Sequence, residues 1–198
     1  MQVFLRLVLT AAFLLTPLVA SASTWKIDPE HSSLQFKIKH LGLAYVRGIF
    51  EKFQGAIRLD EQNLSNSMVQ VNIEVASINS AVPKRDEHLR SPDFFDVATY
   101  PTMTFVSKKI NPDGKEGAQV IGDLTLRGIT KEVVVAVSGP TPAVQDPWGT
   151  TRRGASATAS LDRRDFGLTW HKTLANGVPL IGSEVIIQLE LEMIQVKD

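Results

Sequence analysis

The chain has 198 residues, and its 21 lysines and arginines balance its 21 aspartates and glutamates, so the formal net charge is zero. This length is enough for one domain with a sizeable core. The balanced charge leaves no basic surplus of the kind that indicates a nucleic-acid-binding protein. Because cysteine is absent, a disulfide framework, a thiolate metal site and a cysteine nucleophile are all excluded.

The N-terminal segment has the pattern of an export signal. Arg6 precedes a nearly all-apolar run over residues 7–20, and Ala20, Ser21 and Ala22 give the small-x-small sequence that signal peptidase reads. The run is too short to span a bilayer comfortably. We therefore expect residues 1–22 to be a signal peptide cleaved after Ala22, and residues 23–198 to form one domain in a bacterial periplasm; a permanent N-terminal anchor is the alternative.

The first half of the mature chain alternates between apolar and polar residues. Such alternation predicts half-buried β-strands, because successive side chains of a strand point to opposite faces. The pattern is clean over residues 34–39 and 69–75. It is weaker over residues 48–60, where Gly55 suggests a bulge.

Residues 83–90 break this pattern and predict the one short helix. The segment is charged and has no β-branched residue, Pro83 can occupy its first turn, and Pro92 ends it. Asp86 and Arg90 stand four residues apart, so we expect them to form an ion pair on the helix surface.

Strand patterns return after the helix. We expect strands over residues 103–110, 118–127, 132–138 and 152–162, and a clean alternation covers residues 185–193. Glycine and proline turn signals separate these segments. About eight strands at hairpin-like spacing favour a β-sandwich or a barrel, so the predicted fold class is all-β.

The four histidines stand apart in the sequence. None lies in a zinc-binding motif, and the chain has no nucleophile elbow, P-loop or dinucleotide-binding glycine motif. We therefore expect a protein that is not an enzyme and has no metal or cofactor. His40 continues the inward phase of Leu34, Phe36 and Ile38, which leaves two interpretations: a core or turn histidine, or a polar group at the mouth of an apolar cavity.

Several motifs together closely resemble the YceI family. Residues 85–97 (RDEHLRSPDFFDV) and 100–105 (YPTMTF) are the most specific of these motifs. Residues 25–32 resemble the opening strand of the family, residues 46–50 and 53–55 its next block, residues 122–131 (GDLTLRGITK) a later strand and turn, and residues 164–167 (RDFG) a late element. The ordered combination covers residues 24–194, nearly the whole mature chain.

The resemblance implies a lipocalin-like, extended antiparallel barrel with a helix at the RDEHL segment. It also implies an elongated cavity that binds an isoprenoid or another amphiphilic lipid, often in a periplasmic dimer. Separately from the resemblance, a protein that binds such a ligand can make transient contact with a membrane. The resemblance implies no enzymatic reaction. It leaves the lipid open among isoprenoid quinones, polyprenyl phosphates and fatty amides.

Inward-facing apolar residues of the predicted strands are the candidates for the cavity wall: Phe36, Ile38, Phe53, Val71, Ile73, Phe105, Leu124, Leu189 and Leu191. The same residues would line a packed core. For the lipid head group we predict His40 together with Arg85 and His88, which share a helix face three residues apart. The alternative is that Arg85 and Asp86 tie the helix to neighbouring strands.

We therefore predict a periplasmic lipid-binding protein that transports or stores its ligand. Two other hypotheses stay open: an enzyme acting on an isoprenoid lipid with His40 or His88 as acid or base, and a structural or stress-adaptor barrel filled by its own side chains.

Overall fold

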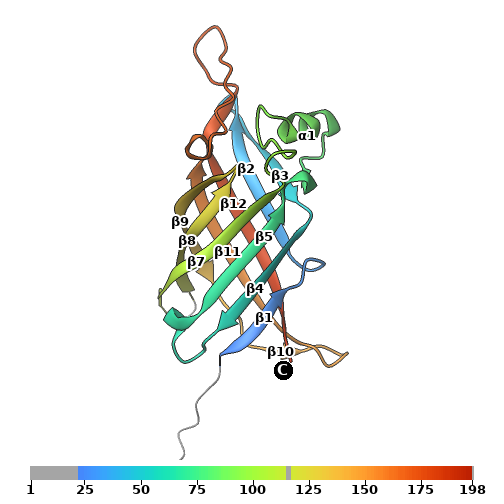
Figure 1. The fold of residues 1–198 in the computed structure, drawn as a ribbon, viewed down its shortest axis with the longest axis vertical. Helices are drawn as coiled ribbons and strands as arrows, with labels where there is room; N and C mark the ends of the chain where they lie inside the picture. The colour runs from blue at the N-terminus through green and yellow to red at the C-terminus, as the bar shows by residue number, and fades with distance from the viewer. Residues whose placement is uncertain (1–21, 115–116, 198) are drawn as a thin grey trace, which may run out of the picture.

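The alternating segments form antiparallel strands in the computed structural model, which describes residues 22–114 and 117–197 (Figure 1). The strands are β1 (Ser23–Ile27), β2 (Ser33–His40), β3 (Ala44–Phe50), β4 (Phe53–Leu59), β5 (Met68–Glu74), β6 (Ile78–Asn79), β7 (Thr102–Pro112), β8 (Gly117–Leu126), β9 (Ile129–Ser138), β10 (Val144–Gln145), β11 (Thr151–Asp162) and β12 (Ile181–Gln195). The helix is α1 (Pro83–Arg90), and short 3₁₀ turns occupy Leu64–Asn66, Val75–Ser77 and Arg163–Phe166.

Eight of these strands close into a barrel, which confirms the predicted fold class. Their order around the ring is β11, β9, β8, β7, β5, β4, β1 and β12, and β12 then pairs with β11. The 15-residue β12 is long enough to pair with β1 near its C-terminal end and with β2 over its N-terminal half. The β2–β3 hairpin therefore extends the wall beyond the ring.

The ladders around the ring differ in length. β11 and β12 are paired over eleven residue pairs, from Arg152↔Ile194 to Asp162↔Glu184. β9 and β11 are paired over only three, from Ser156↔Ser138 to Thr158↔Ala136. β1 and β12 are likewise paired over three, from Trp25↔Gln195 to Ile27↔Met193.

The segment predicted as one bulged strand over residues 48–60 is two strands, β3 and β4, separated by Glu51 and Lys52. The predicted bulge at Gly55 is wrong, because Gly55 lies in regular register opposite Val71. A Cβ atom at Gly55 would lie 2.5 Å from Cδ1 of Ile27. Glycine is therefore required here by close packing and not by a break in the ladder.

The helix has the predicted bounds, but the predicted ion pair between Asp86 and Arg90 is wrong. Asp86 is buried and accepts hydrogen bonds from the backbone N–H and the hydroxyl of Ser80, at 2.8 and 2.5 Å. Arg90 donates to the carbonyls of Ala76 and Ile78, at 2.8 and 2.6 Å. Both side chains thus fasten α1 to the preceding segment, where burial makes their hydrogen bonds stronger than an exposed pair.

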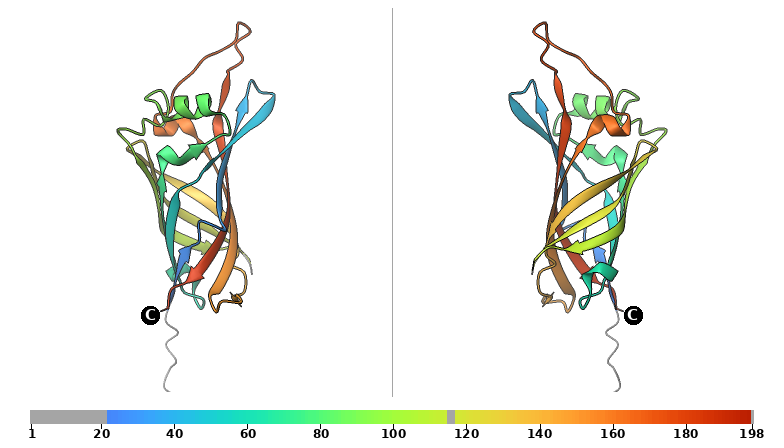
Figure 2. Two further views of the ribbon diagram at one scale, coloured as in Figure 1. Left: turned by 90° about the vertical axis from the view of Figure 1, so that its right-hand side faces the viewer. Right: turned by 90° about the vertical axis from the view of Figure 1, so that its left-hand side faces the viewer.

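The two ends of the barrel differ. Helix α1, the β2–β3 turn and the loop over residues 167–180 lie at one end, which we call the α1 end; the β10–β11 hairpin lies at the other (Figures 1 and 2). Within residues 22–114 and 117–197, no helix is both long and apolar enough to cross a membrane.

Candidate ligand cavity

An apolar cavity of about 480 Å³ lies inside the barrel. Its size is within the usual range for small-molecule sites, about 300–1,000 Å³. All eight ring strands contribute side chains, and these follow the period of two that the sequence shows. On β12, for example, the wall residues are Ile181, Val185, Ile187, Leu189, Leu191 and Met193.

The structure brings together most of the predicted wall residues. Eight of the nine line the cavity: Phe36, Ile38, Val71, Ile73, Phe105, Leu124, Leu189 and Leu191. Phe53 is the exception, because it is buried in the core cluster that also contains Phe50 and Phe94 and does not reach the cavity surface. The cavity shows that the interior is not completely filled by side chains, and ligand contact by each residue stays a prediction.

Sequence reasoning missed the alanines of β11. Ala155, Ala157 and Ala159 all line the cavity, and their single methyl groups leave more free width than leucine or phenylalanine would at these positions. The signal was present, because alanine alternates with Ser156, Thr158 and Ser160 along this strand. Alanine is a weak marker of an inward face, so the pattern identified a strand without identifying its role.

The mouth of the cavity lies at the α1 end. The lining residues that are also exposed, His40, His88 and Ser160, all belong to the half of the barrel nearest α1. Toward the other end, Ile110 and Val120 are buried in a separate cluster that packs against β5 and β9. The exposed part of the cavity lining is therefore at the α1 end, and the buried apolar part lies deeper.

The three predicted head-group residues line this mouth, and two of them, Arg85 and His88, already have hydrogen-bond partners. Arg85 donates from Nε to the hydroxyl of Ser80 and from a terminal nitrogen to its carbonyl, both at 2.7 Å, which is the tethering role given above as the alternative. Nε2 of His88 lies 2.9 Å from a carboxylate oxygen of Asp93. The His88 ring also meets the rings of Phe94 and Trp170 edge-on, at centroid distances of 4.9 and 5.5 Å.

Arg163 is a polar lining residue that sequence reasoning did not select. It is buried, donates from Nε to the carbonyl of Gly182 at 2.9 Å and from a terminal nitrogen to that of Leu168. Burial lowers the pKa of its guanidinium from the usual value. Among the described residues no carboxylate forms a direct ion pair with it, so its charge is balanced by the two carbonyls and, at longer range, by the neighbouring Asp162. Its only sequence signal was its position beside the RDFG element.

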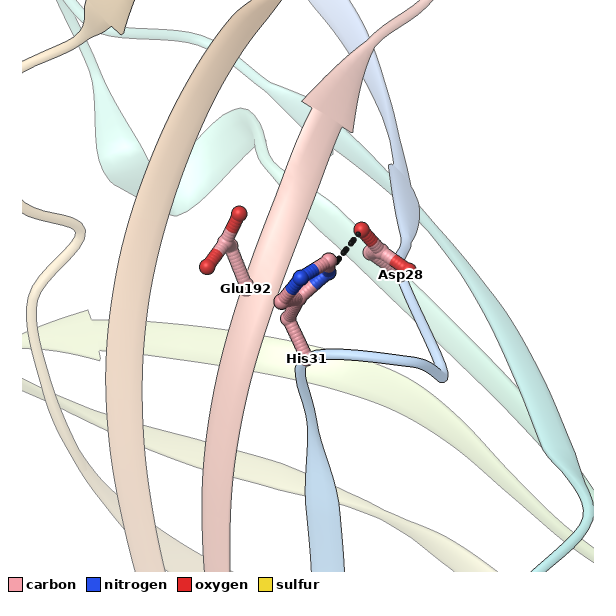
Figure 3. A group of neighbouring side chains, drawn as sticks. All are labelled: Asp28, His31 and Glu192. Atoms are coloured by element: carbon pink, nitrogen blue, oxygen red, sulfur yellow. Dashed lines mark hydrogen bonds and ion pairs between the residues drawn. The ribbon is translucent and has the colours of Figure 1, made fainter. Parts of the chain in front are cut away.

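The described ranges contain one cluster of side chains of the kinds that bind metal ions, formed by Asp28, His31 and Glu192 (Figure 3). Nδ1 of His31 lies 2.8 Å from Asp28. One terminal nitrogen of Arg152 lies 2.7 Å from Asp28 and 2.6 Å from Glu192, and its Nε lies 2.8 Å from Asp146. The guanidinium already supplies the positive charge that these carboxylates need, so we interpret the group as an ion-pair network.

The fold and the cavity define a class of protein: a lipocalin-like barrel with an apolar interior and polar groups at one mouth. The model of the YceI-like domain matches residues 25–193. The chain therefore belongs to the YceI family, as its motifs predicted.

Relatives and solved structures agree with this assignment. A UPF0312 protein of Vibrio cholerae is 41% identical over 160 residues, covering 80% of this chain and 84% of the relative. One from Vibrio vulnificus is 34% identical over 189 residues, 94% of each chain.

Three solved structures have a similar fold. BcnA of Burkholderia cenocepacia has a TM-score of 0.70 at 24% identity, covering 84% of this chain and 98% of that one. The Campylobacter jejuni YCEI protein has a TM-score of 0.64 at 29% identity, covering 82% and 91%. A polyisoprenoid binding domain from Saccharophagus degradans has a TM-score of 0.63 at 16% identity, covering 87% and 98%.

Proposed function

We propose that this chain is a periplasmic lipid-binding protein that holds a long isoprenoid or similar amphiphile for transport or storage. The observation that supports this most directly is the apolar cavity whose arginine and histidine lining residues, His40, Arg85, His88 and Arg163, all lie toward the α1 end. The similarity to a polyisoprenoid binding domain also favours binding over turnover.

The physics of the cavity agrees with a ligand that is mostly hydrocarbon. Burying about ten methylene groups supplies roughly 8 kcal/mol, which corresponds to about micromolar affinity before the costs of binding. The wall alone could therefore hold the chain of the lipid. Arg85, His88 and Arg163, with His40, would then orient the head group and distinguish a quinone, a polyprenyl phosphate and a fatty amide.

Export and assembly belong to the proposal as well. Apart from Ala22, the expected signal peptide lies outside the described residues. Cleavage after Ala22, a periplasmic location and a homodimer are what the N-terminal pattern and the family resemblance support.

The test is the mass of the protein isolated from its own cell envelope, measured under native and denaturing conditions. We expect an excess in the native mass that denaturation releases, and its size would identify the lipid class. The variants Phe36→Asp and Leu189→Asp, which put a charge on the cavity wall, should lose the excess.

The matched control is Gln188→Asp, on the exposed face of β12 beside Leu189. It should keep the ligand. Equal native and denatured masses for the unmodified protein, or a ligand that survives both wall variants, would contradict the proposal.

A further inference from the structure

Two loops project past the mouth of the cavity at the α1 end. They are the β2–β3 turn and the loop over residues 167–180, and both extend beyond α1 (Figure 2). They lie side by side, because the backbone N–H of Leu41 donates to the carbonyl of Leu180 at 2.9 Å and Ile181 pairs with His40. Whatever approaches the mouth along the barrel axis meets these two tips first.

Both tips expose leucine. Leu43 is 80% exposed and Leu174 is 44% exposed. In the first turn, Leu41 and Gly42 have φ of 53° and 71°, a pair of left-handed conformations for which asparagine followed by glycine is preferred. The turn itself therefore does not explain an apolar sequence at this tip.

The surroundings of both tips are basic. Residues 31–50 and 166–183 contain no aspartate or glutamate, although the whole chain is neutral. Lys39 lies over the ring of Tyr45, with Nζ 4.3 Å from the centroid, and Lys172 lies 5.7 Å from that of Trp170. Each tip thus combines an exposed leucine, an aromatic ring and a cation.

The opposite end of the barrel also exposes an apolar side chain, but with different neighbours. Trp148 is 85% exposed there, but it follows Asp146, whose carboxylate accepts a hydrogen bond from the Trp148 backbone. The acidic residues of the α1 end lie on elements closer to the barrel than the two tips, which project past α1 in Figure 2. They include Glu87, Asp93 and Asp96 on α1 and the turn after it, and Asp162, Asp165 and Glu184 at the adjoining ends of β11 and β12.

We propose that the α1 end docks on an anionic membrane surface. Leu43 and Leu174 enter the boundary between head groups and acyl chains, while Lys39 and Lys172 face the lipid phosphates. An anionic membrane surface binds apolar side chains that lie next to cations, because the burial of hydrocarbon and the attraction to anionic lipids both favour binding. The proposal rests on the proposed function, because docking in this orientation brings the cavity mouth against the bilayer.

Flotation with vesicles tests the proposal on the exported protein as the cell processes it. We expect it to float with phosphatidylethanolamine–phosphatidylglycerol vesicles, less with phosphatidylcholine vesicles, and less again as salt is raised. The double variant Leu43→Glu/Leu174→Glu should bind about tenfold more weakly or worse. Lys39→Gln should weaken binding about fivefold.

The matched control is Trp148→Glu, which puts the same charge on the apolar tip at the other end and should bind as the unmodified protein does. Unchanged binding of the double leucine variant, loss of binding in Trp148→Glu, or no flotation at all would each overturn the docking proposal. Native mass separates the two proposals: a protein that retains its lipid but does not float refutes docking alone, whereas one that floats but never contains lipid refutes the proposed function.

Discussion

At the scale of single residues, the width of the cavity depends on positions that look ordinary in the sequence. The large apolar residues of β2, β5, β7 and β12 identified the inward face correctly, because a period of two fixes which side chains share a face. The sequence could not show where the interior stays open. Ala155, Ala157 and Ala159 line the cavity beside the larger residues of β12 with which they pair, and this pairing is a property of the folded barrel and not of any one strand.

Enlarging one of these alanines should block the ligand. Ala157 lines the cavity and is 4% exposed, so Ala157→Phe would fill space that the lipid chain needs. We expect lipid retained in the native mass to fall at least about tenfold, because each excluded methylene removes roughly 0.8 kcal/mol of binding. The neighbouring Thr158 is exposed, and Thr158→Phe should leave retention unchanged; equal loading of both variants would contradict the role of β11.

At the scale of elements, α1 shows both what a sequence predicts and what it does not. Pro83 and Pro92 predicted the bounds of the helix, because proline fits the first turn and cannot continue a helix. The partners of Asp86 and Arg90 were not predictable from spacing, since they lie in the segment before the helix and meet it only in the folded chain. Residues 48–60 were predicted as one strand because the sequence pattern does not show that β3 and β4 separate at Glu51 and Lys52.

We expect the buried carboxylate of Asp86 to contribute most to holding α1 against the segment that precedes it. Asp86→Ala leaves the backbone N–H and hydroxyl of Ser80 without their acceptor, and we expect the free energy of unfolding to fall by about 2 kcal/mol. Glu87→Ala, at the adjacent exposed position, should change it by less than about 0.5 kcal/mol. Denaturant titration measures both, and similar losses in the two variants would show that Asp86 has no special role.

At the scale of the whole molecule, the ion-pair network joins three distant parts of the chain. Arg152 on β11 links Asp28 after β1, Glu192 on β12 and Asp146 beside β10. Burial by itself raises the pKa of Asp28, but the hydrogen bonds from Arg152 and His31 outweigh it, so this pKa lies below its usual 3.8. The hydrogen bond and the charge of Asp28 raise the pKa of His31 above its usual 6.5.

These shifts predict how stability varies with pH. Because the pKa of Asp28 is lowered in the folded protein, its carboxylate stabilises the fold above about pH 3.8, and this stabilisation is lost as pH falls further. Because the pKa of His31 is raised, its imidazolium stabilises the fold below about pH 6.5, and this stabilisation is lost as pH rises through the folded pKa. The melting temperature should therefore decline above about pH 6.5. His31→Gln should flatten this decline and His171→Gln, in an exposed loop, should not; an identical slope in His31→Gln would refute the assignment.

The closed ring also has a mechanical consequence. A closed barrel can widen only if the pairing between two neighbouring strands opens, and a pairing with few residue pairs opens more easily than a long one. Here two ladders of the ring, β9–β11 and β1–β12, have three residue pairs each, where β11 and β12 have eleven. A guest bulkier than the resting interior would open the barrel at one of these two short ladders, while the longer ladders kept the wall intact.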